Sequence, residues 1–264
     1  MGDRAFDTIL AAKEDKVFRI TMNRPQVHNA FNATMIGDLT KAFRLAGSDD
    51  GVRVVVLTGA GESFCAGADL NWMREIIRYS YKQNLKESLQ IAELVKFIYE
   101  LPKPTIARVN GAVIGGGNGL VSACDIVVAS DKARFGLSEV KIGLVPAAIG
   151  PYVIRRIGES AAHELFLTGE RIDASRALEI GLVNKVVPHA ALDEKVEGLV
   201  RLLLSSGPEA IAKCKELLRQ IPGLSLEEAK NYTAEMIARL RTSPEGQEGM
   251  ASFLEKRKPR WAQD

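Results

Sequence analysis

The stretch GAVIGGGNGL at residues 111–120 decides the fold, because it joins a strand-like segment to a helix-like segment through three consecutive glycines. Before it, the β-branched apolar run TIARV at 105–109 is typical of a buried strand. After it, GLVSACDIVVAS at 119–130 begins as an apolar helical turn and continues as another strand. Consecutive glycines lose conformational entropy without packing a side chain. We therefore expect them where backbone N–H groups at a helix N-terminus hold an oxygen atom.

The segments before this stretch alternate between strand and helix patterns. Two runs with alternating apolar residues, FDTILAAKED and KVFRITMN, predict a hairpin, and VRVVVLTG at 52–59 predicts a buried strand. Helical spacing predicts helices over 33–46, which Gly47 ends, and over 83–101, which the prolines at 102 and 104 end. Strand, loop and helix in this alternation indicate an α/β fold with right-handed crossovers.

The character of the chain changes after Pro188. Four segments with helical patterns follow one another without a strand between them, at 190–206, 208–220, 226–240 and 245–255. We therefore predict a core over residues 1–200 and a helical C-terminal region over 201–264.

Two loops of small residues follow two of the predicted buried strands, FCAGADL at 64–70 and IGGGNGL at 114–120. If these strands lie in one sheet, both loops emerge at the carboxyl ends of the strands, where α/β folds place ligands. Two N–H groups from such loops can converge on one oxygen and form an oxyanion hole, in which one donor contributes on the order of 3 kcal/mol to lowering the barrier. Asp69 is placed to cap the helix that carries Trp72 and Met73.

The composition is that of an ordinary globular protein of enzyme size, with 46% apolar and 26% charged residues in 264. A net charge of +2 gives no reason to expect nucleic acid or an anionic membrane as a partner. The start MGDRAFDTIL has no basic segment followed by an apolar one, and no apolar run approaches the length of a membrane span. The sequence thus predicts a cytoplasmic protein.

The cysteines and histidines point to neither disulfides nor a metal. Cys65, Cys124 and Cys214 are scattered, which favours reduced thiols. The three histidines are far apart and lack metal-ligand spacing with the cysteines, at His28, His163 and His189. The chain also lacks a GxSxG motif for a serine nucleophile and a GxxxxGK[ST] motif for a nucleotide phosphate.

The chain resembles the enoyl-CoA hydratase/isomerase (crotonase) family over nearly its whole length. The matching stretches are NRPQVHNAF, VVVLTGAGESFCAGADL, LPKPTIARVNGAVIGGGNGL, CDIVVASDKARFGLSEVKIGLVP, LTGERIDASRALEIGLVNKVV and EGMASFLEKRKPRW. The resemblance implies a ββα spiral core with a helical C-terminal trimerisation region. It also implies that the backbone N–H groups of Ala68 and Gly116 hold the thioester oxygen of an acyl-CoA as it becomes an enolate. No metal or redox cofactor is implied, since coenzyme A enters as part of the substrate.

The resemblance identifies one catalytic glutamate where family hydratases carry two. Glu139, in LSEVKIGL, matches the second of them, whereas the first falls on Gly119. Two carboxylates can divide water activation from proton delivery. With one, Glu139 must do both, or another group must help. Family isomerases shift a double bond with a single glutamate at the position of Glu139, so an isomerase is the alternative activity.

A narrower likeness favours hydration of a branched acyl group. The patterns GADLNWMR, GGGNGL and LSEVKIGLVPAAIGPYVI are similar to bacterial methylglutaconyl-CoA hydratase-type members, which act in leucine breakdown. Such a substrate carries a distal carboxylate, for which we expect a cation in the acyl site. Lys141, Arg155 and Arg74 are the candidates.

The resemblance also implies contacts for coenzyme A and an assembly. Ala66 lies near the adenine in similar proteins, and Phe253 and Lys256 of FLEK reach the nucleotide end, often across a subunit contact. The lysine that often follows NRP in the family is replaced here by Gln26. The expected assembly is a homotrimer or a homohexamer built from two trimers.

Two alternatives of other classes stay open on the sequence. A relative of this family that binds RNA would need a lysine-rich helix face, and the predicted helix 33–46 offers only Lys41 and Arg44. A catalytically inactive relative is the second alternative, because one glutamate is missing.

Overall fold

A parallel sheet with one antiparallel edge strand forms the centre of the molecule. The computed structural model describes residues 6–263, so the first part of MGDRAFDTIL, the segment considered above as a signal sequence, lies outside it. The strands of this sheet, in spatial order, are β1 (Ile9–Glu14), β2 (Val17–Met22), β3 (Val54–Gly59), β5 (Thr105–Val109), β7 (Ile126–Ser130) and β10 (Lys185–Val187). Only β1 is antiparallel to its neighbour, which confirms the predicted hairpin.

A second, smaller sheet carries the two small-residue loops. Its strands in order are β4 (Ser63–Cys65), β6 (Ala112–Ile114), β8 (Arg134–Gly136) and β9 (Arg171–Asp173). The first three are parallel and β9 is antiparallel to β8. The sequence predicts the loops directly after β3 and β5. The structure inserts β4 and β6 between those strands and the loops, but because β4 and β6 are parallel neighbours, both loops still emerge at one edge.

Strand β3 shows why the first sheet is buried on both faces. Val55 and Leu57 belong to the main core between the sheets and the helices. Val54 and Val56 point the other way and pack under α7 (Leu192–Leu204). Because successive side chains of a strand point to opposite faces, an uninterrupted apolar run is what a sheet covered on both sides requires.

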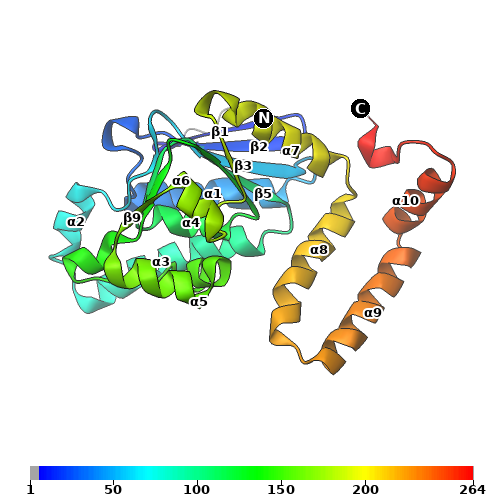
Figure 1. Ribbon diagram of the computed structural model, residues 1–264. Coiled ribbons are helices and arrows are strands. Elements are labelled where there is room, and N and C mark those ends of the chain that lie inside the picture. The colour runs from blue at the N-terminus through cyan, green and yellow to red at the C-terminus, as the bar shows by residue number, and fades with distance from the viewer. Residues whose placement is uncertain (1–5, 264) are drawn as a thin grey trace.

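Within residues 6–263, seven α-helices pack around the sheets, and the three C-terminal helices extend away from them (Figure 1). The helices on the core are α1 (Ala33–Ser48), α2 (Leu70–Ile76), α3 (Tyr81–Glu100), α4 (Gly117–Ala123), α5 (Gly150–Thr168), α6 (Ala174–Glu179) and α7. The helices of the C-terminal region are α8 (Pro208–Gln220), α9 (Leu226–Thr242) and α10 (Pro244–Leu254). The predicted boundary at residues 200 and 201 falls inside α7, and Figure 1 shows the chain leaving the core after that helix.

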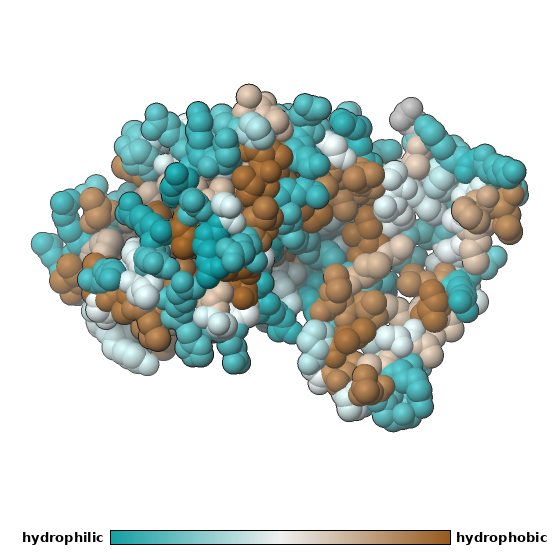
Figure 2. All heavy atoms as spheres, viewed as in Figure 1, coloured by the Kyte–Doolittle hydropathy of each residue, from teal (hydrophilic) through white to brown (hydrophobic). Residues whose placement is uncertain are grey.

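The C-terminal region has little core of its own. Within α8, α9 and α10 only Lys215 and Ser252 are buried. Large apolar side chains are exposed instead, among them Leu226 at 92% and Phe253 at 83% of their full accessible surface. Figure 2 shows apolar side chains gathered along the visible faces of α8 and α9. Among residues 6–263, no helix is long and apolar enough to cross a bilayer.

Candidate active site

The first loop is held so that the Ala68 N–H points away from its supporting strand. The Phe31 N–H donates to the Gly67 carbonyl (2.6 Å), and the Asp69 N–H donates to the Phe31 carbonyl (2.8 Å). In such a parallel bridge the residue between the two bonded neighbours turns its own N–H to the other side. Within the described chain, 6–263, that N–H donates to no protein acceptor.

Asp69 anchors the same loop to α2. Its side chain accepts hydrogen bonds from the Asn71 and Trp72 N–H groups, as the sequence predicts for a helix cap. Its other oxygen pairs with the Arg24 guanidinium at 2.7 Å. Burial raises the pKa of Asp69, but the Arg24 bond and the two backbone donors outweigh it and bring the pKa below its ordinary value.

The second loop turns at Gly115, which adopts a left-handed φ of +51°. The Gly115 N–H donates to the Gly136 carbonyl at 2.8 Å, so it is not free. Gly116 follows as the cap of α4, where the first N–H groups of a helix have no carbonyl one turn back. The Gly116 N–H has no acceptor among residues 6–263. The Asn118 side-chain amide fixes this turn by donating to the carbonyls of Val113, Gly115 and Gly136.

Glu139 meets both loops. A methyl group added at Gly115 would lie 3.2 Å from Glu139 Oε1 and 3.8 Å from Gly67 Cα. One at Gly116 would lie 3.1 Å from the Phe31 ring. Side chains would therefore fill the space in which the two loops and the carboxylate meet, which is the physical reason for the glycine run.

The Glu139 carboxylate is partly desolvated. It stands in the 3-10 helix Ser138–Ile142, and the Glu139 carbonyl accepts from the Leu144 N–H at 3.0 Å. Oε2 is buried and has no hydrogen-bond partner within the described residues. Burial raises the pKa of Glu139, although its own backbone N–H lowers it in part. A carboxyl group with a raised pKa can both give and take a proton near neutral pH.

Position 119 has no room for a side chain. A Cβ atom at Gly119 would lie 2.8 Å from Ile149 Cβ and 3.5 Å from Val95 Cγ2. Ile149 is buried, and it therefore occupies the space that a glutamate at 119 would need. The missing glutamate is evident in the sequence, but the role of Ile149 is not. Phe31, in the NRPQVHNAF stretch, likewise has no sequence signal that reveals its position beside Gly116.

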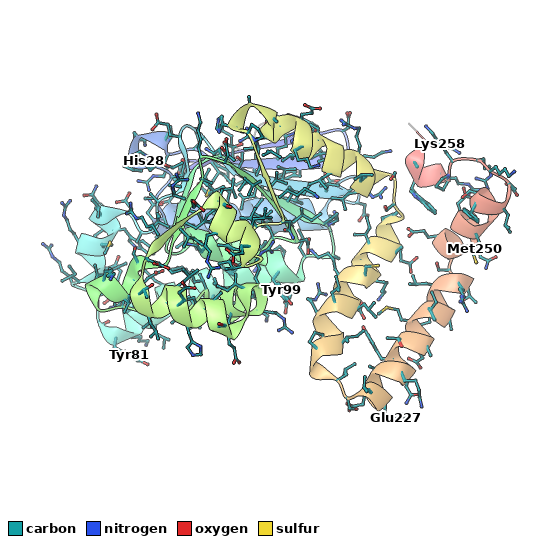
Figure 3. All side chains as sticks on the ribbon, viewed as in Figure 1. His28, Tyr81, Tyr99, Glu227, Met250 and Lys258 are labelled. Atoms are coloured by element: carbon teal, nitrogen blue, oxygen red, sulfur yellow. The ribbon has the colours of Figure 1, made fainter. Side chains whose placement is uncertain are left out.

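The coenzyme A residues predicted from the resemblance do not come together in one chain. The Ala66 N–H donates to the His28 carbonyl at 3.0 Å, so this residue offers a ligand only its carbonyl. Phe253 lies on α10 and Lys256 just beyond it, at a left-handed φ of +54°. Figure 3 shows the labelled neighbours Met250 and Lys258 across the molecule from His28. The roles of all three residues stay predictions.

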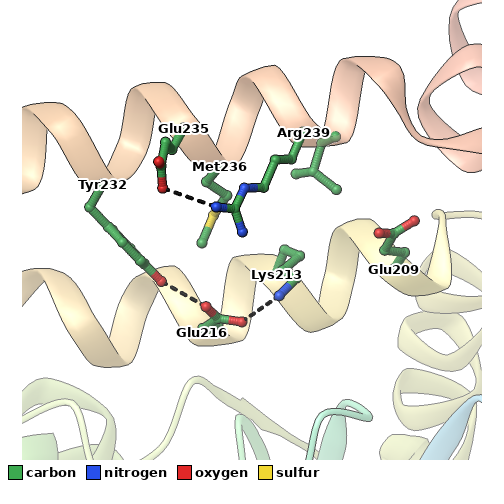
Figure 4. Close-up of a pocket in the computed structure, with 8 residues that line it drawn as sticks. Glu209, Lys213, Glu216, Tyr232, Glu235, Met236 and Arg239 are labelled. Atoms are coloured by element: carbon green, nitrogen blue, oxygen red, sulfur yellow. Dashed lines mark hydrogen bonds and ion pairs between the residues drawn. The ribbon is translucent and has the colours of Figure 1, made fainter.

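Two other places with charged residues differ from this site. In the cleft of about 150 Å³ between α8 and α9, Glu216 pairs with Tyr232 and Lys213, and Glu235 pairs with Arg239 (Figure 4). These carboxylates already have partners, and the cleft lies in the C-terminal region.

The other place adjoins the amino ends of β5 and β7. Asp125 accepts from the Thr105 N–H and hydroxyl and pairs with Lys215, so its carboxylate has a structural role. Arg155 lines the same cleft as Asp125 and Lys215, at the end of the strands opposite to the loops. It is therefore poorly placed to meet an acyl group at Glu139.

Known proteins resemble this chain over nearly its whole length. The family model for enoyl-CoA hydratase/isomerase matches residues 12–264. The 2,3-dehydroadipyl-CoA hydratase of Escherichia coli is 34% identical, over 95% of this chain and 97% of its own length. The short-chain-enoyl-CoA hydratase of Clostridium acetobutylicum is 33% identical, over 96% of each. The crystal structure of an enoyl-CoA hydratase from Shewanella pealeana superposes with a TM-score of 0.95 at 38% identity, covering 98% of this chain and 97% of that one.

Two loops that carry backbone donors lie beside a half-buried glutamate, Glu139, which is an arrangement suited to holding an oxyanion. The chain belongs to the enoyl-CoA hydratase/isomerase family and is an enzyme of it. The crotonase-like fold predicted from the sequence is confirmed.

Proposed function

We propose that this protein adds water across the α,β-double bond of an enoyl-CoA thioester. The observation that carries the proposal is that the loops of Ala68 and Gly116 come together beside Glu139. Within residues 6–263, the N–H groups of Ala68 and Gly116 and the buried Oε2 of Glu139 have no hydrogen-bond partner. The names of the E. coli and C. acetobutylicum relatives, both hydratases, support the same reaction.

The chemistry follows from where charge develops. When the water oxygen bonds to the β-carbon, the electron pair of the double bond moves through the α-carbon onto the thioester oxygen. The N–H groups of Ala68 and Gly116 stabilise that oxyanion, each by on the order of 3 kcal/mol. Glu139 in its protonated form then gives its proton to the α-carbon, and the carbonyl forms again. The proton lost by the water must pass to a base.

The direct test is incubation of the pure protein with crotonyl-CoA. Hydration removes the conjugated double bond, so the ultraviolet absorbance of the thioester falls. Glu139→Gln keeps the size of the side chain but cannot transfer a proton, and we expect it to lower kcat by about 100-fold or more. Glu179→Gln, on the exposed end of α6, is the matched control. Full activity of Glu139→Gln would remove this carboxylate from the reaction.

One observation favours isomerisation as a second candidate activity. Ile149 closes position 119, so the carboxylate that family hydratases carry there is missing. A single glutamate can move one proton between two carbons of a 3-enoyl-CoA. If the protein converts a 3-enoyl-CoA to the 2-enoyl isomer and hydrates neither, the isomerase assignment replaces the hydratase.

For the acyl group we propose a branched chain with a distal carboxylate, such as methylglutaconyl-CoA. The E. coli relative is named for the thioester of a dicarboxylic acid, which supports the distal carboxylate. Lys141, two residues after Glu139 in the same 3-10 helix, and Arg74 on α2 are the cations that we propose for this carboxylate. Comparing kcat/KM for 3-methylglutaconyl-CoA and 3-methylcrotonyl-CoA, which differ in that carboxylate, tests the assignment.

We further propose that the C-terminal helices pack between copies of this chain in a trimer or in a hexamer of two trimers. The exposed apolar side chains of Leu226, Phe253 and Leu254 support this, because a lone chain would leave them in water. Light scattering on the protein as it elutes from a size-exclusion column should give the mass of three or six chains. The mass of a single chain would refute this assembly.

A further inference from the structure

Two half-buried glutamates each have one buried oxygen that accepts no hydrogen bond from residues 6–263. Among residues 6–263, the buried side-chain oxygens that accept no hydrogen bond belong to Glu87, Asn110, Asn118, Ser122 and Glu139. Only Glu87 and Glu139 can carry a charge there. A buried carboxylate oxygen without a donor is costly, and such groups are found where a substrate or a water supplies the missing bond. Glu139 is already assigned to the active site, whereas Glu87 has no role so far.

Glu87 is one side chain away from the first oxyanion loop. Its Oε1 lies 3.4 Å from Trp72 Nε1, which donates to it. Trp72 is buried in the first turn of α2, and its backbone N–H is held by the cap Asp69, which directly follows Ala68. The indole thus connects the first oxyanion loop to the carboxylate on α3, while Glu87 Oε2 accepts no hydrogen bond from the described residues.

The helix geometry places Glu87 at the reacting end of α4. Glu87, Ile91 and Val95 follow one another at four-residue intervals and share a face of α3. Val95 Cγ2 lies 3.5 Å from the Cβ position of Gly119, so this face looks onto α4. Since α3 leads into β5 and α4 into β7, and these strands are parallel neighbours, both helices run in the same direction (Figure 1).

Glu87 precedes Val95 by two turns, which is about 12 Å along the helix. It therefore lies beyond the level of Gly119 on the side where α4 begins, at Gly116. That is the side on which the acyl chain must extend from the thioester oxygen.

We propose that Glu87 is the second carboxylate of the active site and takes the proton from the attacking water. The proposal rests on the hydratase function proposed above. In this step a lone pair of the water oxygen forms the bond to the β-carbon, and one O–H pair stays on that oxygen as its proton moves to Glu87. The electron pair of the double bond moves onto the thioester oxygen. Protonated Glu139 then gives its proton to the α-carbon, and one proton exchanged with solvent restores both groups.

An experiment with two readouts separates this role from the rest of the site. Exchange of the α-hydrogens of butyryl-CoA in D₂O needs the oxyanion donors and Glu139, but no water addition. Hydration of crotonyl-CoA needs the water base as well. The variants are Glu87→Gln, which keeps an acceptor for the Trp72 indole, Glu139→Gln, and Glu93→Gln on the exposed face of α3 as the matched control.

We expect Glu87→Gln to lose hydration by about 100-fold or more while it retains exchange near the wild-type rate. Glu139→Gln should lose both activities and Glu93→Gln neither. If Glu87→Gln hydrates crotonyl-CoA at the wild-type rate, the proposed role of Glu87 is wrong, but the proposed hydratase function is unaffected. Equal loss of both activities in Glu87→Gln would also overturn it, since the residue would then support the site in general. Exchange without hydration in the wild-type protein would instead refute the hydratase function.

Discussion

The contact between positions 119 and 149 makes a quantitative prediction about stability. Gly119 lies inside α4, and a Cβ atom there would be 2.8 Å from Ile149 Cβ. Gly119→Ala forces Ile149 to shift, and overpacking of this kind costs about 2 kcal/mol. Alanine regains about 1 kcal/mol of helix propensity over glycine. The net loss in the free energy of unfolding is therefore about 1 kcal/mol.

Ile149→Ala alone should be more damaging. The side chain is 3% exposed, and removing it leaves a cavity that costs about 3 kcal/mol. In the double variant the strain disappears, the helix propensity is still gained, and the new methyl group fills part of the cavity. The loss should then be about 1.5 kcal/mol, which is about 2.5 kcal/mol less than the two single losses together.

Urea denaturation of the four proteins at one protein concentration measures this coupling, since any assembly makes stability concentration-dependent. Additivity within about 0.5 kcal/mol would refute the reasoning, because it would mean that the two side chains do not compete for one space. Ala46→Gly paired with Ile149→Ala is a control, because Ala46 lies in α1 and should contribute additively.

Three further predictions concern single residues. Burial raises the folded-state pKa of Glu139 above its usual 4.5, so the native state holds this proton more tightly than the unfolded chain. The associated stability is present below about pH 4.5 and is lost as the pH rises through the folded-state pKa. Urea titrations should therefore show Glu139→Gln to be more stable than wild type at pH 7, with a difference that shrinks toward pH 4.5. Asp69→Ala removes two cap bonds and the partner of Arg24, so it should lower the free energy of unfolding by about 2 kcal/mol and lower the thermal midpoint with it. Because the folded-state pKa of Asp69 is lowered, this destabilisation should fade as the pH falls through that pKa. A destabilisation that persists at acidic pH would contradict the ion pair. Lys141→Met should reduce kcat/KM for 3-methylglutaconyl-CoA about tenfold and leave that for crotonyl-CoA unchanged, and an equal change in both would exclude Lys141 as the partner of the distal carboxylate.

Local sequence signals located several helices but not α5 or α6, and α1 continues through Gly47, which the sequence predicts to end it. Helix α8 spans the residues predicted for it, because Pro208 is favoured at the first position of a helix. Helix α3 begins two residues before the predicted start, at Tyr81, because Ser80 and Gln83 form a capping box that the apolar spacing does not reveal. The strands β4, β6, β8 and β9 escaped prediction, since three residues are too few to show an alternation.

The contacts that build the site are not local, and the sequence alone could not give them. The bridge between Phe31 and Ala68 aims one oxyanion donor, yet the two residues are joined only by the tertiary fold. Ile149 and Gly119 likewise meet across α5 and α4. The family pattern supplied the identity of Ala68, Gly116 and Glu139. The reason that position 119 is glycine, and the partnerless state of Glu87, required coordinates.

A site whose oxyanion donors are backbone groups can change its side-chain chemistry without losing the stabilised intermediate. The N–H groups of Ala68 and Gly116 are fixed by Phe31 and by the start of α4, and neither depends on the side chain at 119. Replacing a glutamate there with glycine removes a proton acceptor but leaves the enolate stabilised. The base that water addition needs can then come from another element, provided that its carboxylate lies along the acyl chain. In the proposal made above, the proton acceptor lies on α3 at Glu87, while position 119 on α4 is glycine.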